Sequence, residues 1–332
     1  MSGFRRLVPL LAVVLALSAC AGGPGPVVPD AGTTAGPACA PGAVEVGPTA
    51  DALQSAIDAA RPGDALQLAP TTYPGRFHVS TSGTAEAPIV LCGVRGSIID
   101  GGDTGEGYAL HLDGVEYWEV RDLSVRGAQK GVVLDAVSYT ALSALTISDV
   151  GQEGLHLRTG SSDNTVSDVT VERTGLRDPQ FGEGVYIGSA ESNWCRYSDC
   201  RPDRSDRNVL ERLRVSDTTA EAVDVKEGTS DGVIRSSTLS IAPGAVVDSA
   251  VDLKGSGWSL TSSTVTAPAE AVSVHVILPP WGSGNTVSGS ALITDGGGIG
   301  VHLVGAARAA GNVIACDNTV SSGASLGSSS CP

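Results

Sequence analysis

The fold is decided by a short strand pattern, first seen in Ala109-Leu-His-Leu112 and repeated in Gly131-Val-Val-Leu134 and Gly154-Leu-His-Leu157. Each copy reads small, aliphatic, variable, aliphatic. Further copies occupy residues 184–187, 222–225, 250–253, 271–274 and 300–303. The first aliphatic residues fall at 110, 132, 155, 185, 223, 251, 272 and 301, so the steps are 22, 23, 30, 38, 28, 21 and 29 residues. Such a repeat, with occasional insertions, is typical of the coils of a parallel β-helix.

Strand geometry predicts which side chains of each copy are buried, because neighbouring residues point to opposite faces of a sheet. We expect one inward stack, made of Leu110, Val132, Leu155, Val185, Val223, Val251, Val272 and Val301. Further strands are expected at residues 166–171, 209–215, 233–241, 260–265 and 287–293. Asparagines precede several of them, and we expect left-handed backbone at Asn164, Asn208, Asn285 and Asn312.

The ends of the repeat region also fit this fold. Residues 49–60 form an amphipathic segment with Thr49 as a capping candidate, and a short helix there would cover the open edge of the first coil. Aromatic residues make up only 4% of the chain, which disfavours a conventional globular core. The sequence therefore predicts an all-β fold, a single right-handed parallel β-helix over residues 44–332 with a short N-terminal capping helix.

The N-terminus indicates export. Arg5 and Arg6 precede an apolar run over residues 7–17, which is too short to span a bilayer but suits a signal peptide, here residues 1–19. The run ends in Leu17-Ser-Ala-Cys20, which resembles a bacterial lipobox and implies lipidation of Cys20. An ordinary secretory signal is the alternative. Residues 20–43 then form a flexible Gly/Pro/Ala/Thr tether. We expect an exported protein that is anchored to the bacterial cell membrane by its lipid and faces away from the cytoplasm.

Charge and cysteine content restrict the partners. The chain carries a net charge of −15, and removing two arginines with the signal peptide gives −17, so nucleic acid is not an expected partner. Apart from Cys20, six cysteines remain in an exported chain, which predicts disulfides. Spacing suggests the pairs Cys39–Cys92, Cys195–Cys200 and Cys316–Cys331. We expect a monomer.

The coil layout, with Ile98-Ile-Asp-Gly-Gly102 on an early rung, resembles the pectate-lyase-like β-helix superfamily. The resemblance covers nearly all of the chain after the tether. It implies the fold more directly than an activity, because such folds carry lyases, hydrolases, epimerases and adhesins.

The outward positions of the repeated strand gather charged and aromatic side chains on its middle rungs, about 4.8 Å apart. These residues are Glu153, His156, Arg158, Glu183, Tyr186, Glu221, Asp224, Lys226, Asp252, Lys254 and His275. Insertions beside these rungs carry Trp194 and Trp281, and we expect both, with Tyr186, to bind sugar rings. Two alternatives remain open: the tryptophans pack the loops, and the Asp/Lys pairs form a self-neutralising ladder.

This face offers the groups that a uronic-acid lyase needs, namely a base for the proton alpha to the carboxylate and a cation to absorb the developing charge. Glu183, Glu221 and Asp224, with Asp252 as a further ligand, could hold Ca²⁺. Lys226 or Lys254 is the candidate base, with its pKa lowered by the second lysine and the bound ion.

The flanking rungs supply the remaining catalytic candidates. Arg158 and His156 would hold substrate carboxylates on neighbouring subsites. His275, one rung beyond Lys254, completes this set.

A closer resemblance lies in Ala220-Glu-Ala-Val-Asp-Val-Lys226, which is similar to the active-site rungs of the chondroitinase B and alginate lyase family. The resemblance implies Glu221 as a calcium ligand and Lys226 as the base. This chain has Asp224 in addition, lacks the family's second glutamate, and has Leu253-Lys-Gly255 where the family has Arg-His-Gly.

We therefore predict a cell-surface lyase that cleaves an acidic polysaccharide with the help of Ca²⁺. One alternative is a glycoside hydrolase that uses Asp224 and Asp252 as paired carboxylates. The other is a non-catalytic carbohydrate-binding protein, which the strong negative charge favours because a polyanion is repelled at long range.

Overall fold

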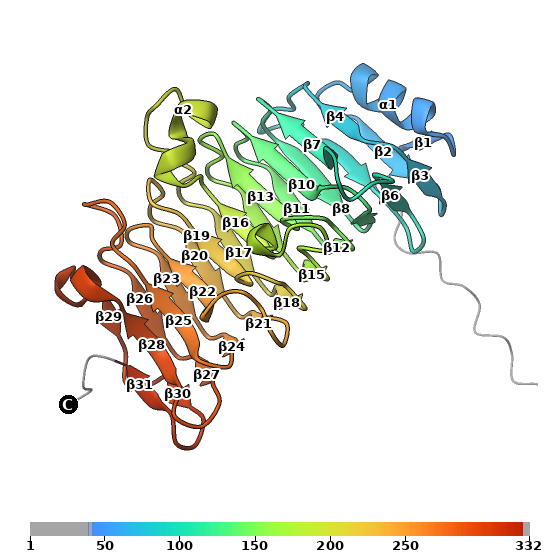
Figure 1. Cartoon of the computed structure of the whole chain (residues 1–332). Helices are drawn as coiled ribbons and strands as arrows, with labels where there is room; N and C mark the ends of the chain where they lie inside the picture. Colours follow the sequence, from blue (N-terminus) through green and yellow to red (C-terminus); the bar gives the residue numbers. More distant parts are fainter. Residues whose placement is uncertain (1–38, 40–41, 328–332) are drawn as a thin grey trace, which may run out of the picture. The chain divides into compact units, whose positions relative to one another are not determined.

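A computed structural model describes residues 39 and 42–327, and in it the chain forms a parallel β-helix. Three sheets run along the described residues, and each strand pairs with the strand one coil later (Figure 1). From residue 65 onward, each coil contributes one strand to sheet 1, then one to sheet 2, then one to sheet 3. The all-β solenoid predicted from the repeat is confirmed.

The three sheets are named in the order in which the chain enters them. Sheet 1 contains β1 (Val44–Val46), β2 (Ala65–Leu68), β5 (Ile89–Cys92), β8 (Trp118–Arg121), β11 (Ala141–Ser143), β14 (Thr165–Ser167), β17 (Val209–Glu211), β20 (Val233–Arg235), β23 (Ser259–Thr261), β26 (Thr286–Ser288) and β29 (Val313–Ile314). Sheet 2 contains β3 (Thr72–Pro74), β6 (Ile98–Asp100), β9 (Ser124–Arg126), β12 (Thr146–Ser148), β15 (Thr170–Glu172), β18 (Arg214–Ser216), β21 (Thr238–Ser240), β24 (Thr264–Thr266), β27 (Ala291–Ile293) and β30 (Thr319–Val320). Sheet 3 contains β4 (Phe77–Val79), β7 (Tyr108–Asp113), β10 (Lys130–Asp135), β13 (Leu155–Arg158), β16 (Val185–Ile187), β19 (Val223–Val225), β22 (Ser249–Leu253), β25 (Glu270–Val274), β28 (Ile299–Leu303) and β31 (Ser325–Gly327).

Sheet 3 is the repeated strand of the sequence pattern, and its register is the predicted one. Each inward aliphatic residue pairs with its counterpart one coil later, from Leu110 with Val132 to Val272 with Val301. All eight are fully buried in one hydrophobic core. The sheet also extends one strand beyond the predicted set at each end, through β4 and β31.

The prediction of continuous strands outside this sheet was wrong in one respect. Each of the five predicted segments is divided into two strands by a bend between sheets 1 and 2. The residue at the bend has a positive φ, as in Asp168 (56°), Arg212 (52°) and Ser236 (52°). A single left-handed residue turns the chain while the apolar alternation on either side continues, so the sequence pattern hides the break.

The predicted asparagine positions were displaced by one residue. The residues with positive φ are Asp163, Arg207, Gly284 and Gly311. The asparagines that follow two of them, Asn164 and Asn208, are buried, and their side-chain amides form hydrogen bonds with the backbone of the turns. Asn208 Oδ1 accepts from Asn164 N at 3.0 Å, and Asn208 Nδ2 donates to Ser161 O at 2.8 Å. These asparagines therefore satisfy buried polar groups between coils.

Helix α1 (Ala50–Ala59) is the predicted capping helix. Thr49 Oγ1 accepts a hydrogen bond from Ala52 N at 3.2 Å, and Leu53 and Ile57 are buried in the core. The other helical turns lie in the insertions: η1 (Pro179–Phe181), η2 (Glu191–Asn193), α2 (Trp194–Tyr197) and η3 (Gly305–Ala309). Among the described residues, no helix combines the length and hydropathy needed to cross a membrane.

Two of the predicted disulfides are confirmed, Cys39–Cys92 and Cys195–Cys200. The third prediction involves Cys331, which lies outside the described residues. The signal peptide, Cys20 and most of the tether also lie outside them.

Candidate active site

Four neighbouring strands of sheet 3, β13, β16, β19 and β22, carry the predicted site on their outward face. Strand pairing places Tyr186 beside Asp224, and Asp224 beside Asp252. Most of the polar side chains here are nonetheless buried, because neighbouring rungs and the insertions cover them. The buried members are Glu153, His156, Arg158, Glu183, Asp224, Asp252 and Lys254.

Asp224 is the centre of a chain of ion pairs. Its Oδ2 lies 2.7 Å from Lys226 Nζ and its Oδ1 lies 2.8 Å from Lys254 Nζ. Lys254 Nζ also lies 2.8 Å from Asp252 Oδ2, and Asp252 Oδ1 lies 2.8 Å from His275 Nδ1. Asp224 thus joins the two lysines, and Lys254 extends the chain to Asp252 and from there to His275.

This arrangement changes the expected charge state of the lysines. Burial disfavours the charged form of Lys226, but the Asp224 carboxylate outweighs burial and raises the pKa of Lys226 above its usual range. Asp224 and Asp252 raise the pKa of Lys254 against burial in the same way. The predicted lowering by a second lysine acts on Lys254, but the carboxylates of Asp224 and Asp252 outweigh it. Lys254 contacts two carboxylates closely and Lys226 one, so Lys226 is the less constrained amine.

Three carboxylates, those of Glu183, Glu221 and Asp224, form an acidic cluster in which one oxygen of each lies within 4.8 Å of the others. Glu183 Oε2 is buried and, among the described residues, has no hydrogen-bond partner. Burial, followed by the charges of Glu153 and Asp224, raises the pKa of Glu183 well above its usual range. Burial and Asp224 raise the pKa of Glu221 to about 7. Both glutamates therefore favour a proton or a cation.

The donor set of this cluster fits a hard cation such as Ca²⁺, which binds carboxylate oxygens. Asp224 already shares both oxygens with lysines, so Glu183 and Glu221 would be the principal ligands and Asp224 the third. Asp252, the fourth predicted ligand, lies outside the cluster and contacts Lys254 and His275 instead.

A pocket of about 320 Å³ opens on the N-terminal side of this cluster. It is lined by Tyr108, Gln129, Lys130, Gln152, Glu153, His156, Phe181, Tyr186, Ser189, Asn193, Arg196 and Tyr197. Strands of sheet 3 form its floor, and η1, η2 and α2 contribute to its wall. Tyr186 lies at the boundary, because it lines the pocket and its ring centroid is 5.0 Å from Lys226 Nζ. A polymer in this pocket would therefore reach Lys226 by passing over Tyr186.

His156 and Arg158 support this pocket from below. His156 packs edge-on against Tyr186 at 4.4 Å, and its Nε2 lies 3.0 Å from Gly188 O. Burial lowers the pKa of His156. Arg158 is 2% exposed and donates to Asp135 at 2.7 and 2.9 Å. Arg158 also donates to Tyr108 Oη at 3.0 Å. His156 both lines the pocket and packs against Tyr186, so the two side chains help to position the tyrosines.

The two predicted tryptophans pack the loops. Trp194 is 7% exposed and donates from Nε1 to Ser189 O at 2.9 Å. Its ring meets Trp281 edge-on at 5.6 Å, and neither residue lines the pocket. The geometry thus matches the loop-packing alternative.

The aromatic wall of the pocket comes from Phe181 and Tyr197. Sequence reasoning did not assign Phe181, because it lies in an insertion without strand periodicity. For Tyr197 the available signal was its place inside the Cys195–Cys200 loop.

No protein-family model matches the chain. The pectate lyase PEL9 of Emericella nidulans is 27% identical over 190 residues, which cover 52% of this chain and 44% of that protein. The chain therefore spans less than half of the length of this curated relative.

Two solved structures share the solenoid. An alginate lyase from Paenibacillus sp. str. FPU-7 is 32% identical with a TM-score of 0.75, and the match covers 83% of this chain and 99% of that one. The pectate lyase Pel9A is 17% identical with a TM-score of 0.58, covering 81% of this chain and 72% of that one. At that identity, the second likeness concerns the fold alone.

Proposed function

The chain belongs to the pectate-lyase-like superfamily of parallel β-helix proteins and, within it, to the family of the Paenibacillus alginate lyase; from this premise we propose that it is a polysaccharide lyase that cleaves an acidic uronate polymer by β-elimination. The single observation that supports the site assignment is the position of Lys226. This amine lies over the ring of Tyr186, which lines the pocket, and pairs with Asp224 of the acidic cluster.

Lys226 is the proposed base for the proton alpha to the substrate carboxylate. In the structure the Asp224 carboxylate keeps the amine of Lys226 charged. This amine therefore has to release a proton before it can accept one from the sugar. Ca²⁺ bound by Glu183 and Glu221 would neutralise the substrate carboxylate and, through its charge, lower the pKa of the nearby amine. Lys254 is a positioning residue in this scheme, because it holds Asp224 and Asp252 together.

Tyr186 is the proposed hydrogen-bond donor to the leaving oxygen. Burial and the charge of Asp224 raise the pKa of Tyr186 well above its usual range, so the phenol keeps its proton at neutral pH. His156 packs against this ring and orients it. The lysine and the tyrosine thus approach one sugar from the same end of the pocket, as a proton acceptor and a proton donor.

Turnover on a panel of uronate polymers, with added Ca²⁺ and with a chelator, tests this function. We expect new unsaturated chain ends, detected by their ultraviolet absorbance, and a loss of turnover with the chelator. Saturated reducing ends without that absorbance would instead indicate a hydrolase. Absence of any product from the whole panel would contradict an enzymatic role and favour carbohydrate binding alone.

The geometry speaks against the hydrolase alternative. Its paired carboxylates would be Asp224 and Asp252, and both contact Lys254 Nζ at 2.8 Å. A hydrolytic pair needs one carboxyl that is protonated and faces the scissile bond. The pKa of Asp224 is lowered, because its two lysines outweigh burial, so this carboxyl is a poor proton donor.

We also propose that the protein acts at the cell surface, held by a lipid on Cys20. Support comes from the apolar run and the lipobox-like Leu17-Ser-Ala-Cys20. Fractionation of cells that express the Cys20→Ser variant tests this location. We expect the variant to leave the membrane fraction, and unchanged retention would contradict lipid anchoring.

A further inference from the structure

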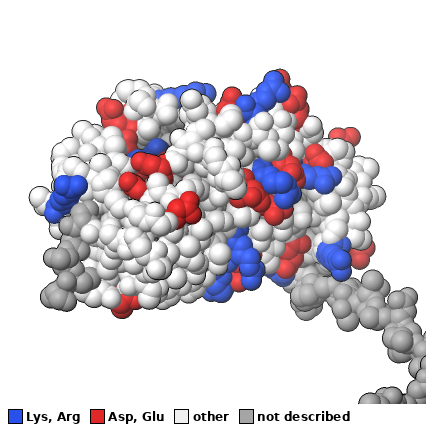
Figure 2. All heavy atoms as spheres, turned by 60° about the horizontal axis from the view of Figure 1, so that its bottom comes forward, with Lys and Arg blue, Asp and Glu red and all other residues white. Residues whose placement is uncertain are grey.

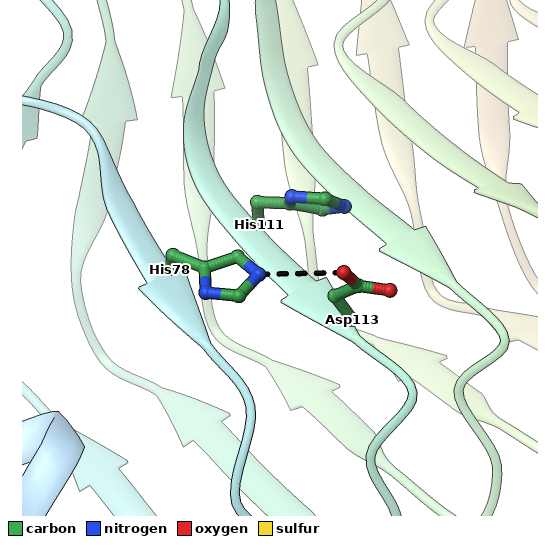
Figure 3. Close-up of side chains that lie close together, drawn as sticks. All are labelled: His78, His111 and Asp113. Atoms are coloured by element: carbon green, nitrogen blue, oxygen red, sulfur yellow. Dashed lines mark hydrogen bonds and ion pairs between the residues drawn. The ribbon is translucent and has the colours of Figure 1, made fainter.

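A second polar cluster lies at the N-terminal end of sheet 3, where His111 packs edge-on against the pocket residue Tyr108 at 5.1 Å. It consists of His78, His111 and Asp113, whose side chains converge above β4 and β7 (Figure 3). His78 and His111 are register partners on these adjacent strands, and Asp113 follows His111 by two residues on the same outward face. One nitrogen or oxygen of each residue lies within 4.8 Å of the others.

The separations are close to those of a bound metal ion. Four ligands of Zn²⁺ at about 2.0–2.1 Å in a tetrahedron lie roughly 3.3 Å from one another. His78 Nε2 lies 3.4 Å from Asp113 Oδ2, so this pair already has the required spacing. The ligand nitrogen of His111 lies within 4.8 Å of both atoms, so a side-chain adjustment can bring it to the same spacing. The side chains of His78 and Asp113 are about half exposed, at 50% and 52%, which leaves room for this adjustment and for a solvent ligand.

His111 has the hydrogen bond typical of a metal-bound histidine. Its Nε2 lies 2.9 Å from Asp135 Oδ2, which leaves Nδ1 for a ligand. Asp135 is itself held by Arg158 Nε and Thr159 Oγ1, each at 2.7 Å. A carboxylate on the second ring nitrogen fixes the tautomer and the ring orientation of a ligating histidine.

His78 is held through its backbone by helix α1. Gln54 Oε1 accepts from His78 N at 3.0 Å, and Gln54 Nε2 donates to His78 O at 2.8 Å. Both histidines are therefore presented by elements whose positions are fixed before any ion binds, which reduces the cost of ordering the site.

We propose that His78, His111 and Asp113 bind one transition-metal ion of the Zn²⁺ class, with one coordination position open to solvent. Two imidazole nitrogens and one carboxylate form a donor set that suits Zn²⁺, Co²⁺ or Ni²⁺, whereas Ca²⁺ prefers oxygen ligands alone. The site is distinct from the acidic cluster, which lies on β16 and β19 and offers only oxygens. The bound ion bridges β4 and β7 and adds a positive charge to the outward face of sheet 3 in an acidic protein.

Isothermal titration with Zn²⁺ tests the site, on the full chain without a polyhistidine tag and with Ca²⁺ present to occupy the carboxylates. We expect one equivalent to bind, and a tetrahedral visible spectrum when Co²⁺ replaces Zn²⁺. The His78→Ala/His111→Ala double variant should lose at least 100-fold in affinity, and Asp135→Asn about 10-fold or more. Asp113→Asn, which removes only a charge from a half-exposed side chain, should also weaken binding with the fold unchanged by circular dichroism.

The matched control is His302→Ala. This histidine also faces outward on sheet 3, and its Nδ1 lies 2.7 Å from Glu270 Oε1. We expect its loss to leave Zn²⁺ binding unchanged. Equal Zn²⁺ affinity in the wild type and the double variant, or no saturable binding by the wild type, would overturn the proposal. Lost binding in the His302 variant alone would move the ion to the other end of the sheet and overturn it as well.

Discussion

Two sets of charged residues in this molecule have similar compositions and opposite character. At the turns between sheets, arginines pair with carboxylates one coil away: Arg207 with Asp163 at 2.7 Å through two nitrogens, and Arg212 with Asp168 at 2.9 and 2.8 Å. These arginines are about half exposed. On the face shown in Figure 2, basic side chains are likewise scattered among acidic ones and form no broad patch.

On sheet 3 the carboxylates outnumber their close cationic partners and are buried. Glu221 has Lys254 only at 4.0 Å, and Glu183 Oε2 has no hydrogen-bond partner in the described chain. Exposed pairs contribute little to stability, whereas buried charges without matched partners cost free energy. The comparison shows that burial and incomplete pairing, rather than residue type, distinguish the sheet 3 cluster from the surface pairs.

The largest expected effect comes from moving a charge by one residue. Asp224 is tolerated because it faces outward between two lysines, whereas Val223 faces the core. Val223→Asp should cost at least about 4 kcal/mol and disrupt the middle coils, because it buries an unpaired carboxylate. Thermal melting measures this loss, with Val223→Ala as the control for lost volume. Wild-type melting of the aspartate variant would show that the register of sheet 3 is incorrect.

The second prediction compares how a lysine of sheet 3 and a surface arginine affect turnover. Lys226→Ala should lower kcat on an acidic polysaccharide by about 1,000-fold, since a general base contributes roughly 10²–10⁴. Arg212→Ala, which removes a surface cation, should leave turnover within about twofold. Steady-state kinetics at saturating Ca²⁺ provide the comparison, and circular dichroism verifies the fold. If Lys226→Ala kept full activity and Lys254→Ala were inactive, the general base would be Lys254, one coil later.

The third prediction concerns pH. Folding raises the pKa of Glu221 from 4.5 to about 7, so the folded state binds more protons than the unfolded state between these values. Stability from this group is therefore present below pH 4.5 and is lost as the pH rises towards and through 7. The loss is on the order of 3 kcal/mol.

Glu221→Gln removes this titration. Urea unfolding at pH 5 and pH 8 should show a stability difference that is smaller in the variant than in the wild type. Ca²⁺ should reduce the wild-type difference, because a bound cation compensates the ionised carboxylates. An identical pH dependence of the two proteins would mean that Glu221 ionises freely.

The solenoid could be predicted from sequence because its core depends on strand alternation, which is a local property. The stack from Leu110 to Val301 and the outward columns follow directly from the repeat. The pocket depends on insertions: Phe181 and Tyr197 reach it through η1 and α2, and no periodicity predicts where such turns fold back.

The charge state of the site is likewise non-local. Alternation placed Asp224 and both lysines on one face, but only the side-chain geometry shows Asp224 between the amines and raises their pKa values. The same geometry ties Arg158 to Asp135 and Tyr108, two contacts that strand alternation does not predict.

The smallest expected effect is at the surface ladder itself. A double-mutant cycle of Arg212→Ala and Asp168→Ala should give little or no coupling energy, because the arginine is about half exposed and the solvent screens the pair. High salt should reduce the coupling further. Urea unfolding of the four proteins at low and high ionic strength measures both quantities. A coupling as large as that of a buried ion pair would show that these surface pairs stabilise the coils as strongly as buried contacts do. The energies of the pairs would then no longer distinguish the surface pairs from the sheet 3 cluster. The remaining differences would be the pocket and Glu183 Oε2, which has no hydrogen-bond partner among the described residues.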